Sequence, residues 1–370
     1  MEGDVNALRA DQVGSLLRPS VLIQARVDFS AGRLDRQGLT AEEDRAILDA
    51  LRHQRDCGID IFTDGEFRRA SFMGAFLDGV DGFVEAEAVG VPWRAMTVAE
   101  GRSQAARVVA GKLRSRGRIN EVEATFLRQH AGGAFKITLP SPLLFAEEAY
   151  RSHVTAEAYT SRAELIADAA SILATEAGRL AAEGVPYIQV DAPGYTHWAD
   201  PNLVDASRAN GVDMAELLKA ALAADNRILD AARDGGALTA VHLCRRNSMG
   251  RWLAEGGCDA IAATLFTRLR CDRLLLEYES PSAGGFAPLR FVPANKVVVL
   301  GLITTKTGEM ESRDELLRRI DEASHVVPLE QLALSTQCGF ASSQIGNALS
   351  HEAQWRKLEL VASLAREVWP

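Results

Sequence analysis

Eight short apolar runs, separated by longer stretches, limit most strongly what this chain of 370 residues can fold into. The run Val297–Ile303, for example, contains no polar residue at all. Strands without polar alternation are typical of a parallel sheet that is covered on both faces. We therefore expect eight such strands: the segment ending at Val13, then Ile59–Thr63, Phe135–Thr138, Tyr187–Val190, Ala237–Val241, Leu274–Leu276, Val297–Leu302 and Leu332–Ser335.

The stretches between these runs have the residue spacing of amphipathic helices. From Trp355 to Val368, apolar residues recur at steps of three and four, which places them on one helix face. Asp213–Arg233 and Glu42–Cys57 have a similar pattern, and glycine follows each of them closely. Strands that alternate with helices predict an α/β fold, and we expect a single (β/α)8 TIM barrel over residues 1–370.

One segment interrupts this alternation. Residues 71–133 stand where a barrel needs only one helix, after the second expected strand. A segment of about sixty residues is too small to form a good core alone. We expect an insertion into the barrel, built as a hairpin plus a helix, and not a separate domain.

Composition excludes several classes of partner. The net charge is -9 and the sequence has no cluster of Lys and Arg, which argues against nucleic-acid binding. The longest apolar stretch has seven residues, far fewer than a membrane span requires. Five cysteines, an odd number, and a polar start without an apolar leader segment favour a reducing compartment. We expect a cytoplasmic protein.

Polar residues follow nearly every expected strand. In a barrel, the carboxyl ends of all strands lie on one face, so residues far apart in sequence meet there. These residues are Gly14-Ser15, Asp64-Gly65-Glu66, Pro140-Ser141, Asp191, His242 with Cys244, Glu277, Thr304-Thr305-Lys306 and Cys338.

Four of these residues form a ligand set suited to zinc, namely His242, Cys244, Glu277 and Cys338. At an extended strand end, residues two apart project to the same side, so His242 and Cys244 can reach one ion. Each residue alone has a more ordinary interpretation, as a packed thiol or a solvated carboxylate. Their joint placement favours the metal. The other cysteines, Cys57, Cys258 and Cys271, have no ligand-type neighbour and are expected to be packed thiols.

The two cysteines in this set indicate the chemistry. A free thiol has a pKa of about 8.5, so it is mostly protonated, and a poor nucleophile, at neutral pH. Zinc deprotonates a coordinated thiol. Two cysteinates and a carboxylate would leave the site with a surplus negative charge, and a substrate sulfur bound there would be electron-rich. The set therefore favours alkyl transfer to sulfur over hydrolysis.

Several motifs, in this order, resemble the cobalamin-independent methionine synthase family, and in particular its short single-barrel members. Epoxyalkane:coenzyme M transferase belongs to the same group. The resemblance runs from about residue 9 to the C-terminus. It is carried by Arg9-Ala-Asp-Gln-Val-Gly-Ser-Leu-Leu-Arg-Pro19, Thr63-Asp-Gly-Glu-Phe-Arg68, Ile188-Gln-Val-Asp191, His242-Leu-Cys244, Leu276-Glu-Tyr278, Val298-Val-Leu-Gly-Leu-Ile-Thr-Thr-Lys306 and Leu334-Ser-Thr-Gln-Cys-Gly-Phe340.

The resemblance implies a TIM barrel, zinc held by the four residues above, and methyl transfer to a substrate thiol. It also implies that Ser15, Glu66 and Asp191 bind the amino-acid part of homocysteine. Carboxylates suit a substrate ammonium, and the backbone N–H groups at Gly14 and Ser15 suit a substrate carboxylate.

The sequence departs from the synthases in two places. They have Glu-Pro after the Asp191 position, whereas this chain has Ala192-Pro193, with Tyr195 and His197 as further substrate contacts. Their catalytic histidine after the seventh strand is replaced by the run that ends at Lys306, which could act as a proton donor or an anion contact. We expect Asp191 and Lys306 to act in catalysis.

Several alternatives stay open at this point. The thiol is homocysteine or coenzyme M, and the alkyl donor is methylfolate, methylcobalamin or an epoxide. A metal-free barrel that acts as a binding protein or a decarboxylase is a third hypothesis. The sequence is compatible with a homo-oligomer and does not fix the oligomeric state.

Overall fold

The main sheet consists of six parallel strands in the computed structural model, which describes residues 8–86 and 106–370. The strands lie in the sheet in chain order, so each connection crosses over from one strand to its neighbour. All but two of their residues are buried, as expected for a sheet covered on both faces. The strands are β3 (Lys136–Pro140), β4 (Tyr187–Asp191), β5 (Leu238–Leu243), β6 (Arg273–Glu277), β7 (Val297–Ile303) and β8 (Leu332–Thr336).

Six of the expected strands are confirmed, but the first two are not regular strands. The segment ending at Val13 and the segment 59–63 each make one isolated parallel bridge. Ala10 bridges Leu334 of β8, and Phe62 bridges Phe135 beside β3.

Side chains explain why these two segments form no ladder. The carboxylate of Asp60 accepts hydrogen bonds from the N–H groups of Arg9 and Ala10, both at 2.8 Å. Since side chains satisfy these backbone groups, regular strand pairing is not required. Three carbonyl oxygens are also bonded by side chains: Gln12 by Lys136, Val13 by Gln189, and Ile61 by Gln12.

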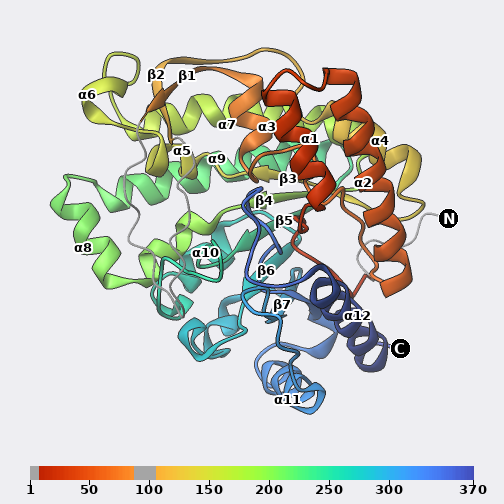
Figure 1. The fold of residues 1–370 in the computed structure, drawn as a ribbon. Helices are drawn as coiled ribbons and strands as arrows, with labels where there is room; N and C mark the ends of the chain where they lie inside the picture. Colours follow the sequence, from red (N-terminus) through yellow and green to blue (C-terminus); the bar gives the residue numbers. More distant parts are fainter. Residues whose placement is uncertain (1–7, 87–105) are drawn as a thin grey trace.

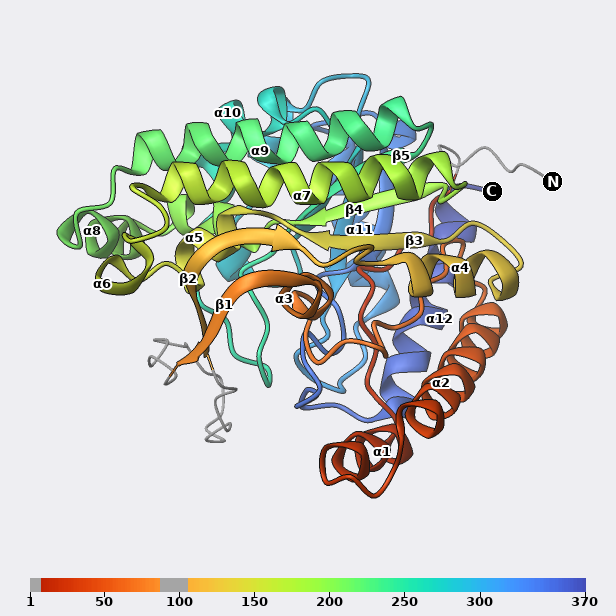
Figure 2. The ribbon, with the colours of Figure 1, turned by 90° about the horizontal axis from the view of Figure 1, so that it is seen from above.

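Helices cover the sheet (Figure 1). The three expected helices are confirmed as α2, α9 and α12; α2 ends at Gly58, whose φ of 76° is the left-handed conformation that glycine adopts readily. The long helices α7 and α9 run side by side along the sheet in Figures 1 and 2. The helices are α1 (Ser20–Ser30), α2 (Arg36–Cys57), α3 (Gly74–Gly79), α4 (Glu121–His130), α5 (Leu143–Glu148), α6 (Ser152–Thr155), α7 (Arg162–Ala182), α8 (Pro201–Ala209), α9 (Met214–Asp234), α10 (Ala262–Arg268), α11 (Arg313–Ser324) and α12 (His351–Val368), with a 3-10 helix η2 (Pro193–Ala199) after β4.

Buried apolar side chains form two separate groups. The larger group fills the space between the helices and the sheet. The smaller group takes one residue from each of five strands and from both N-terminal segments, so these seven segments face a common interior. Its members are Val13, Ile61, Tyr187, Ala240, Leu275, Val299 and Ala333.

The described part of residues 71–133 contains a second sheet and a helix. Strand β1 (Val80–Ala86) pairs antiparallel with β2 (Ala106–Ser115), and α4 follows. Part of the expected insertion, residues 87–105, lies outside the described residues. Glu123 of α4 accepts two hydrogen bonds from Arg69, at 2.8 and 2.6 Å, and Arg69 also donates to Thr138 of β3. These bonds connect the segment, through Arg69, to the middle of β3.

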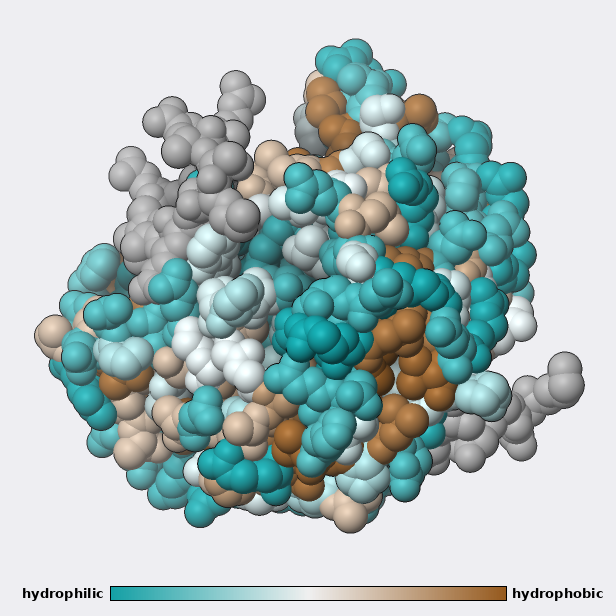
Figure 3. Space-filling view, turned by 90° about the horizontal axis from the view of Figure 1, so that it is seen from below, coloured by the Kyte–Doolittle hydropathy of each residue, from teal (hydrophilic) through white to brown (hydrophobic). Residues whose placement is uncertain are grey.

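The face of the molecule drawn in Figure 3 is mostly polar. Figure 3 shows hydrophilic side chains over much of one face, interrupted by a smaller apolar area. Among the described helices, none combines the length and apolarity that crossing a membrane requires.

Candidate metal centre

The end of β5 places two potential metal ligands on one side of the sheet. His242 is the fifth residue of β5 and Cys244 follows the strand directly. Residues two apart in extended chain point the same way. His242 is buried, and neither of its ring nitrogens has a hydrogen-bond partner. A buried imidazole without partners is costly, which indicates that a ligand or an ion completes the site.

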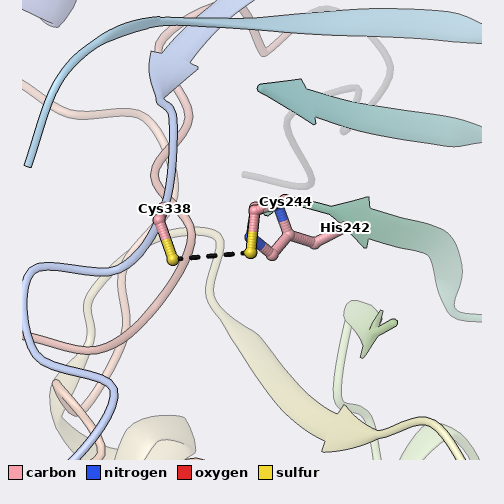
Figure 4. A group of neighbouring side chains, drawn as sticks. All are labelled: His242, Cys244 and Cys338. Carbon is pink, nitrogen blue, oxygen red and sulfur yellow. Dashed lines mark hydrogen bonds between the residues drawn. The ribbon is translucent and has the colours of Figure 1, made fainter. Parts of the chain in front are cut away.

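Cys338, which follows β8, joins this pair. The side chains of His242, Cys244 and Cys338 each offer one donor atom, and these three atoms lie within 4.8 Å of one another. The two sulfurs are 3.7 Å apart and face each other in Figure 4. The cysteines are free, and their sulfurs are too far apart for a disulfide. Contact with Cys338, together with burial, raises the pKa of the Cys244 thiol well above its usual range.

Glu277, the fourth expected ligand, lies outside this group of three. It ends β6, and its carboxylate accepts hydrogen bonds from Lys306 at 2.8 Å and from the backbone N–H of Arg245. Burial opposes ionisation of Glu277, but Lys306 and Arg245 outweigh it and lower the pKa of this carboxyl group. Both oxygens of Glu277 are therefore bonded within the protein.

Lys306 is held between two carboxylates. It donates to Glu277 and to Glu279, and its ammonium nitrogen lies 5.6 Å from the centre of the Trp252 ring. Burial lowers the pKa of Lys306, but the two carboxylates have a larger combined effect and raise it. Burial and the neighbouring Glu277 raise the pKa of Glu279 to about 7. The lysine is thus a bound cation at neutral pH.

Glu66 is in the left-handed conformation, with φ of 59°, which is strained for a residue with a side chain. Arg18 stabilises this turn, because its guanidinium donates to the carbonyl oxygens of Glu66 and Arg69. One carboxylate oxygen of Glu66 accepts from Thr138 at 2.9 Å, and the other is buried without a partner. Glu66 is therefore a fixed carboxylate with one free oxygen.

Asp191 ends β4 and is the strand partner of His242 on β5. Burial, with the nearby charge of Glu66, raises the pKa of Asp191 to about 6, although His242, Gln189 and Lys136 oppose the shift. Two buried carboxylates that repel each other favour a cation between them.

Gly14 and Ser15 lie against the loop that carries Cys338. The carbonyl oxygen of Ser15 accepts a hydrogen bond from Phe340 at 2.8 Å. A methyl group added to Gly339 would lie 2.0 Å from the Ser15 hydroxyl oxygen, so this approach requires glycine. The two segments are therefore adjacent, although more than 300 positions separate them.

Tyr195 and His197 bond to other parts of the protein. The Tyr195 hydroxyl is buried and donates to Asp225 of α9 at 2.7 Å. The Nδ1 atom of His197 lies 2.8 Å from Glu147, which also accepts from Arg246 at 3.0 Å. The hydroxyl of Tyr195 is directed toward α9, and His197 of η2 contacts Glu147 of α5.

Several residues at this end of the sheet were not predicted to matter. Gln189 bonds Asp191, Arg245 bonds Glu277, and Glu279 bonds Lys306. A sequence signal existed for Glu279, which is the second residue after the strand that ends at Glu277. Asp64 was noted only as part of a motif; burial raises its pKa to about 7, and one of its oxygens has no partner.

Comparisons with known proteins show which family the chain resembles over nearly its whole length. The sequence model described as "Cobalamin-independent synthase, Catalytic domain" matches residues 10–356. The uncharacterized protein YxjH of Bacillus subtilis (strain 168) is 38% identical over 98% of this chain and 94% of its own length. A solved structure from Listeria monocytogenes, assigned to the vitamin-B12 independent methionine synthases, is 27% identical with a TM-score of 0.73 and covers 98% of both chains.

A second solved structure shares the fold. It is a B12-independent methionine synthase from Shewanella sp. W3-18-1 in complex with selenomethionine, with 23% identity and a TM-score of 0.73 over 98% of this chain and 97% of that one. The match of the family sequence model over nearly the whole chain therefore shows that this protein belongs to the cobalamin-independent synthase catalytic-domain family.

Proposed function

We propose that this protein is a zinc-dependent methyltransferase that acts on a substrate thiol, with homocysteine as the acceptor. The observation that carries the proposal is the group formed by His242, Cys244 and Cys338. Similar proteins support it, since a protein of Saccharolobus solfataricus that is 22% identical over 94% of this chain is named methionine synthase.

The donors in this group fit zinc. Two sulfurs and one imidazole nitrogen are preferred zinc ligands. Two thiolates bound to one tetrahedral zinc ion lie about 3.8 Å apart, because each Zn–S bond is about 2.3 Å, and the sulfurs here are 3.7 Å apart. The free nitrogens of His242 supply the third donor. Bound zinc would lower the pKa of an incoming thiol and so supply a thiolate nucleophile.

We place Glu277 as the fourth ligand when no substrate is bound. Its contacts with Lys306 and Arg245 hold it in a second position beside the group of three. A site with three protein ligands and one open position is typical of catalytic zinc. Lys306 holds the Glu277 carboxylate beside the group of three, which would give Lys306 a role in catalysis as a positioning residue without proton transfer.

The chain's own residues orient the amino-acid part of homocysteine. Glu66 and Asp191 are two buried carboxylates that would suit its ammonium, and the backbone N–H groups at Gly14 and Ser15 would suit its carboxylate. With the thiol held, a sulfur–carbon bond forms to the methyl group as the bond from methyl to donor breaks, and the donor leaves with that electron pair. The methyl donor is methylfolate, methylcobalamin or a related small molecule.

Coenzyme M is the weaker alternative acceptor. Its sulfonate would require a free cation, and four cations near the strand ends, among the described residues, all have protein partners. Arg18 bonds backbone carbonyls, Arg68 pairs with Glu43 and Asp44, Arg69 pairs with Glu123, and Lys306 pairs with two glutamates.

We also propose that the sheet closes into an eight-membered barrel that is one catalytic domain. The bridges from Ala10 to Leu334 and from Phe62 to Phe135 lie at the two edges of the six-stranded sheet. The N–H of Asp60 donates to the carbonyl oxygen of Ala10, which links the two N-terminal segments to each other. The inner apolar group, with residues from seven segments, supports closure.

Formation of methionine tests the proposal. Purified protein with zinc and homocysteine is supplied in turn with methylfolate and methylcobalamin, and product is measured by mass spectrometry. We expect methionine with at least one donor, and no methylated product from coenzyme M. Zinc below about 0.2 per chain that is not restored by added metal, together with no product from any donor, would contradict the proposal.

A further inference from the structure

A buried glutamine in β4, Gln189, connects the candidate site to the interior of the sheet. Its amide nitrogen donates two hydrogen bonds, to Asp191 at 2.7 Å and to the carbonyl oxygen of Val13 at 2.8 Å. Its amide oxygen accepts from Lys136 at 2.7 Å. The side chain is fully buried. Both N–H groups of the amide and its oxygen are thus in use.

Lys136 determines which end of the Gln189 amide faces Asp191. Lysine has three donors and no acceptor, and Lys136 directs them at Asp11, at the carbonyl oxygen of Gln12 and at Gln189. If the amide were reversed, its NH2 group would face the ammonium and its oxygen would face the Asp191 carboxylate. Lys136 therefore fixes the amide with its donors toward Asp191.

The result is a fixed carboxylate at the point where the substrate amine is expected. Asp191 is a strand partner of His242, and its pKa is sensitive to the charge of Glu66. We propose that Gln189, oriented by Lys136, is the positioning residue that aims Asp191 at the amine of an amino-acid thiol. Selectivity for a thiol that carries an amine then depends on the hydrogen bonds from Lys136 to Gln189 and from Gln189 to Asp191. Metal binding does not depend on these bonds. This inference rests on the proposed function.

Two thiols that differ only in the amine test the inference. Homocysteine has a thiol, a carboxylate and an amine, and 4-sulfanylbutanoate lacks the amine. We expect the wild-type enzyme to prefer homocysteine in kcat/KM. In Gln189→Met this preference falls about tenfold, mostly through a higher KM for homocysteine, because a hydrogen bond to a charged group is lost. Zinc per chain stays at the wild-type value.

Two further variants separate positioning from a general effect on folding. In Gln189→Glu, the new carboxylate still accepts a hydrogen bond from Lys136, and this contact favours the ionised form of the glutamate. An ionised glutamate cannot donate a hydrogen bond to Asp191, so the same loss of preference is expected. The control is Gln331→Met, since the side-chain amide of Gln331 likewise donates two hydrogen bonds, here to the backbone carbonyls of Pro293 and Lys296 at the other end of the sheet. The control keeps the full preference.

The outcomes distinguish the inference from the proposed function. Equal losses with both thiols in the Gln189 variants would show a purely structural role and overturn the inference. So would a Gln189→Met enzyme that keeps the full preference of an active wild type. A wild-type enzyme that turns over neither thiol would overturn the proposed function, and the inference with it.

Discussion

The candidate metal centre and the polar network beneath it are both buried and charged, but they differ in how their polar atoms are satisfied. We define the polar network as Asp11, Lys136, Tyr187 and Gln189. All three donors of Lys136 are bonded, and Tyr187 donates to Asp11 at 3.2 Å. In the metal centre, both ring nitrogens of His242 have no partner.

This difference separates structural from functional polar groups. A buried polar atom without a partner costs about 1–3 kcal/mol, so it persists where a ligand supplies the missing contact. A network whose donors are all bonded needs no ligand and stabilises the fold. We therefore expect substitutions in the metal centre to abolish zinc retention at little cost in stability, and substitutions in the network to lower stability while zinc is retained.

The largest effect is expected from Cys338→Ser. This change removes one of three grouped donors, so zinc retention should be lost and methionine formation should fall on the order of a thousandfold, or about 4 kcal/mol. Metal analysis and initial rates measure both. Cys271→Ser is the control, because Cys271 is also a buried free thiol but lies outside the group. Full zinc content in Cys338→Ser would contradict the distinction between the metal centre and the polar network.

The next largest effect is expected from Lys136→Met. The change leaves the buried carboxylate of Asp11 without its ion-pair partner at 2.8 Å, which should lower the free energy of unfolding by about 3 kcal/mol. Urea denaturation measures it, and zinc per chain should not change. In the control Lys296→Met, the lost partners are the backbone carbonyls of Phe266 and Leu269, so the cost should be smaller. Loss of zinc at unchanged stability would contradict the distinction between the two regions.

The sequence was informative where local pattern determines structure. The runs that became β3 to β8 are rich in apolar residues and almost entirely buried, so their ends could be predicted to within two residues. His242 and Cys244 could be paired because they are two apart at a strand end, and Cys338 because it follows another strand that reaches the same edge.

Contacts between side chains far apart in sequence could not be predicted. The prediction of regular strands in the first two segments was wrong, because the side chains of Asp60, Lys136 and Gln189 bond backbone groups there. The contacts of Lys306 with Glu277 and Glu279 depend on side-chain directions that no residue spacing encodes. For the same reason, the bond from Tyr195 to Asp225 could not be anticipated.

The smallest effect concerns Asp225, which tests whether a buried oxygen without a partner marks a ligand site by itself. Tyr195 and Ser141 both donate to one oxygen of Asp225, at 2.7 and 3.0 Å, and the other oxygen has no partner. Within residues 8–86 and 106–370, no ionised group is bonded to this carboxyl group. We expect the buried carboxyl group of Asp225 to be protonated, because the neutral form is cheaper to bury than the carboxylate. Asp225 would then need no ligand and would resemble the polar network.

The pH dependence of stability tests this expectation for Asp225. Burial raises its pKa to about 7, although the two hydrogen bonds oppose the shift. Because the folded pKa lies above the unfolded value near 4, the stabilising proton is fully retained below pH 4 and lost as the pH rises through 7. Asp225→Asn keeps an acceptor and cannot ionise, so its stability relative to wild type should rise by about 2 kcal/mol from pH 5 to pH 8. Urea denaturation at several pH values measures this difference. A difference that stays constant with pH, or loss of zinc in the variant, would place Asp225 with the functional groups.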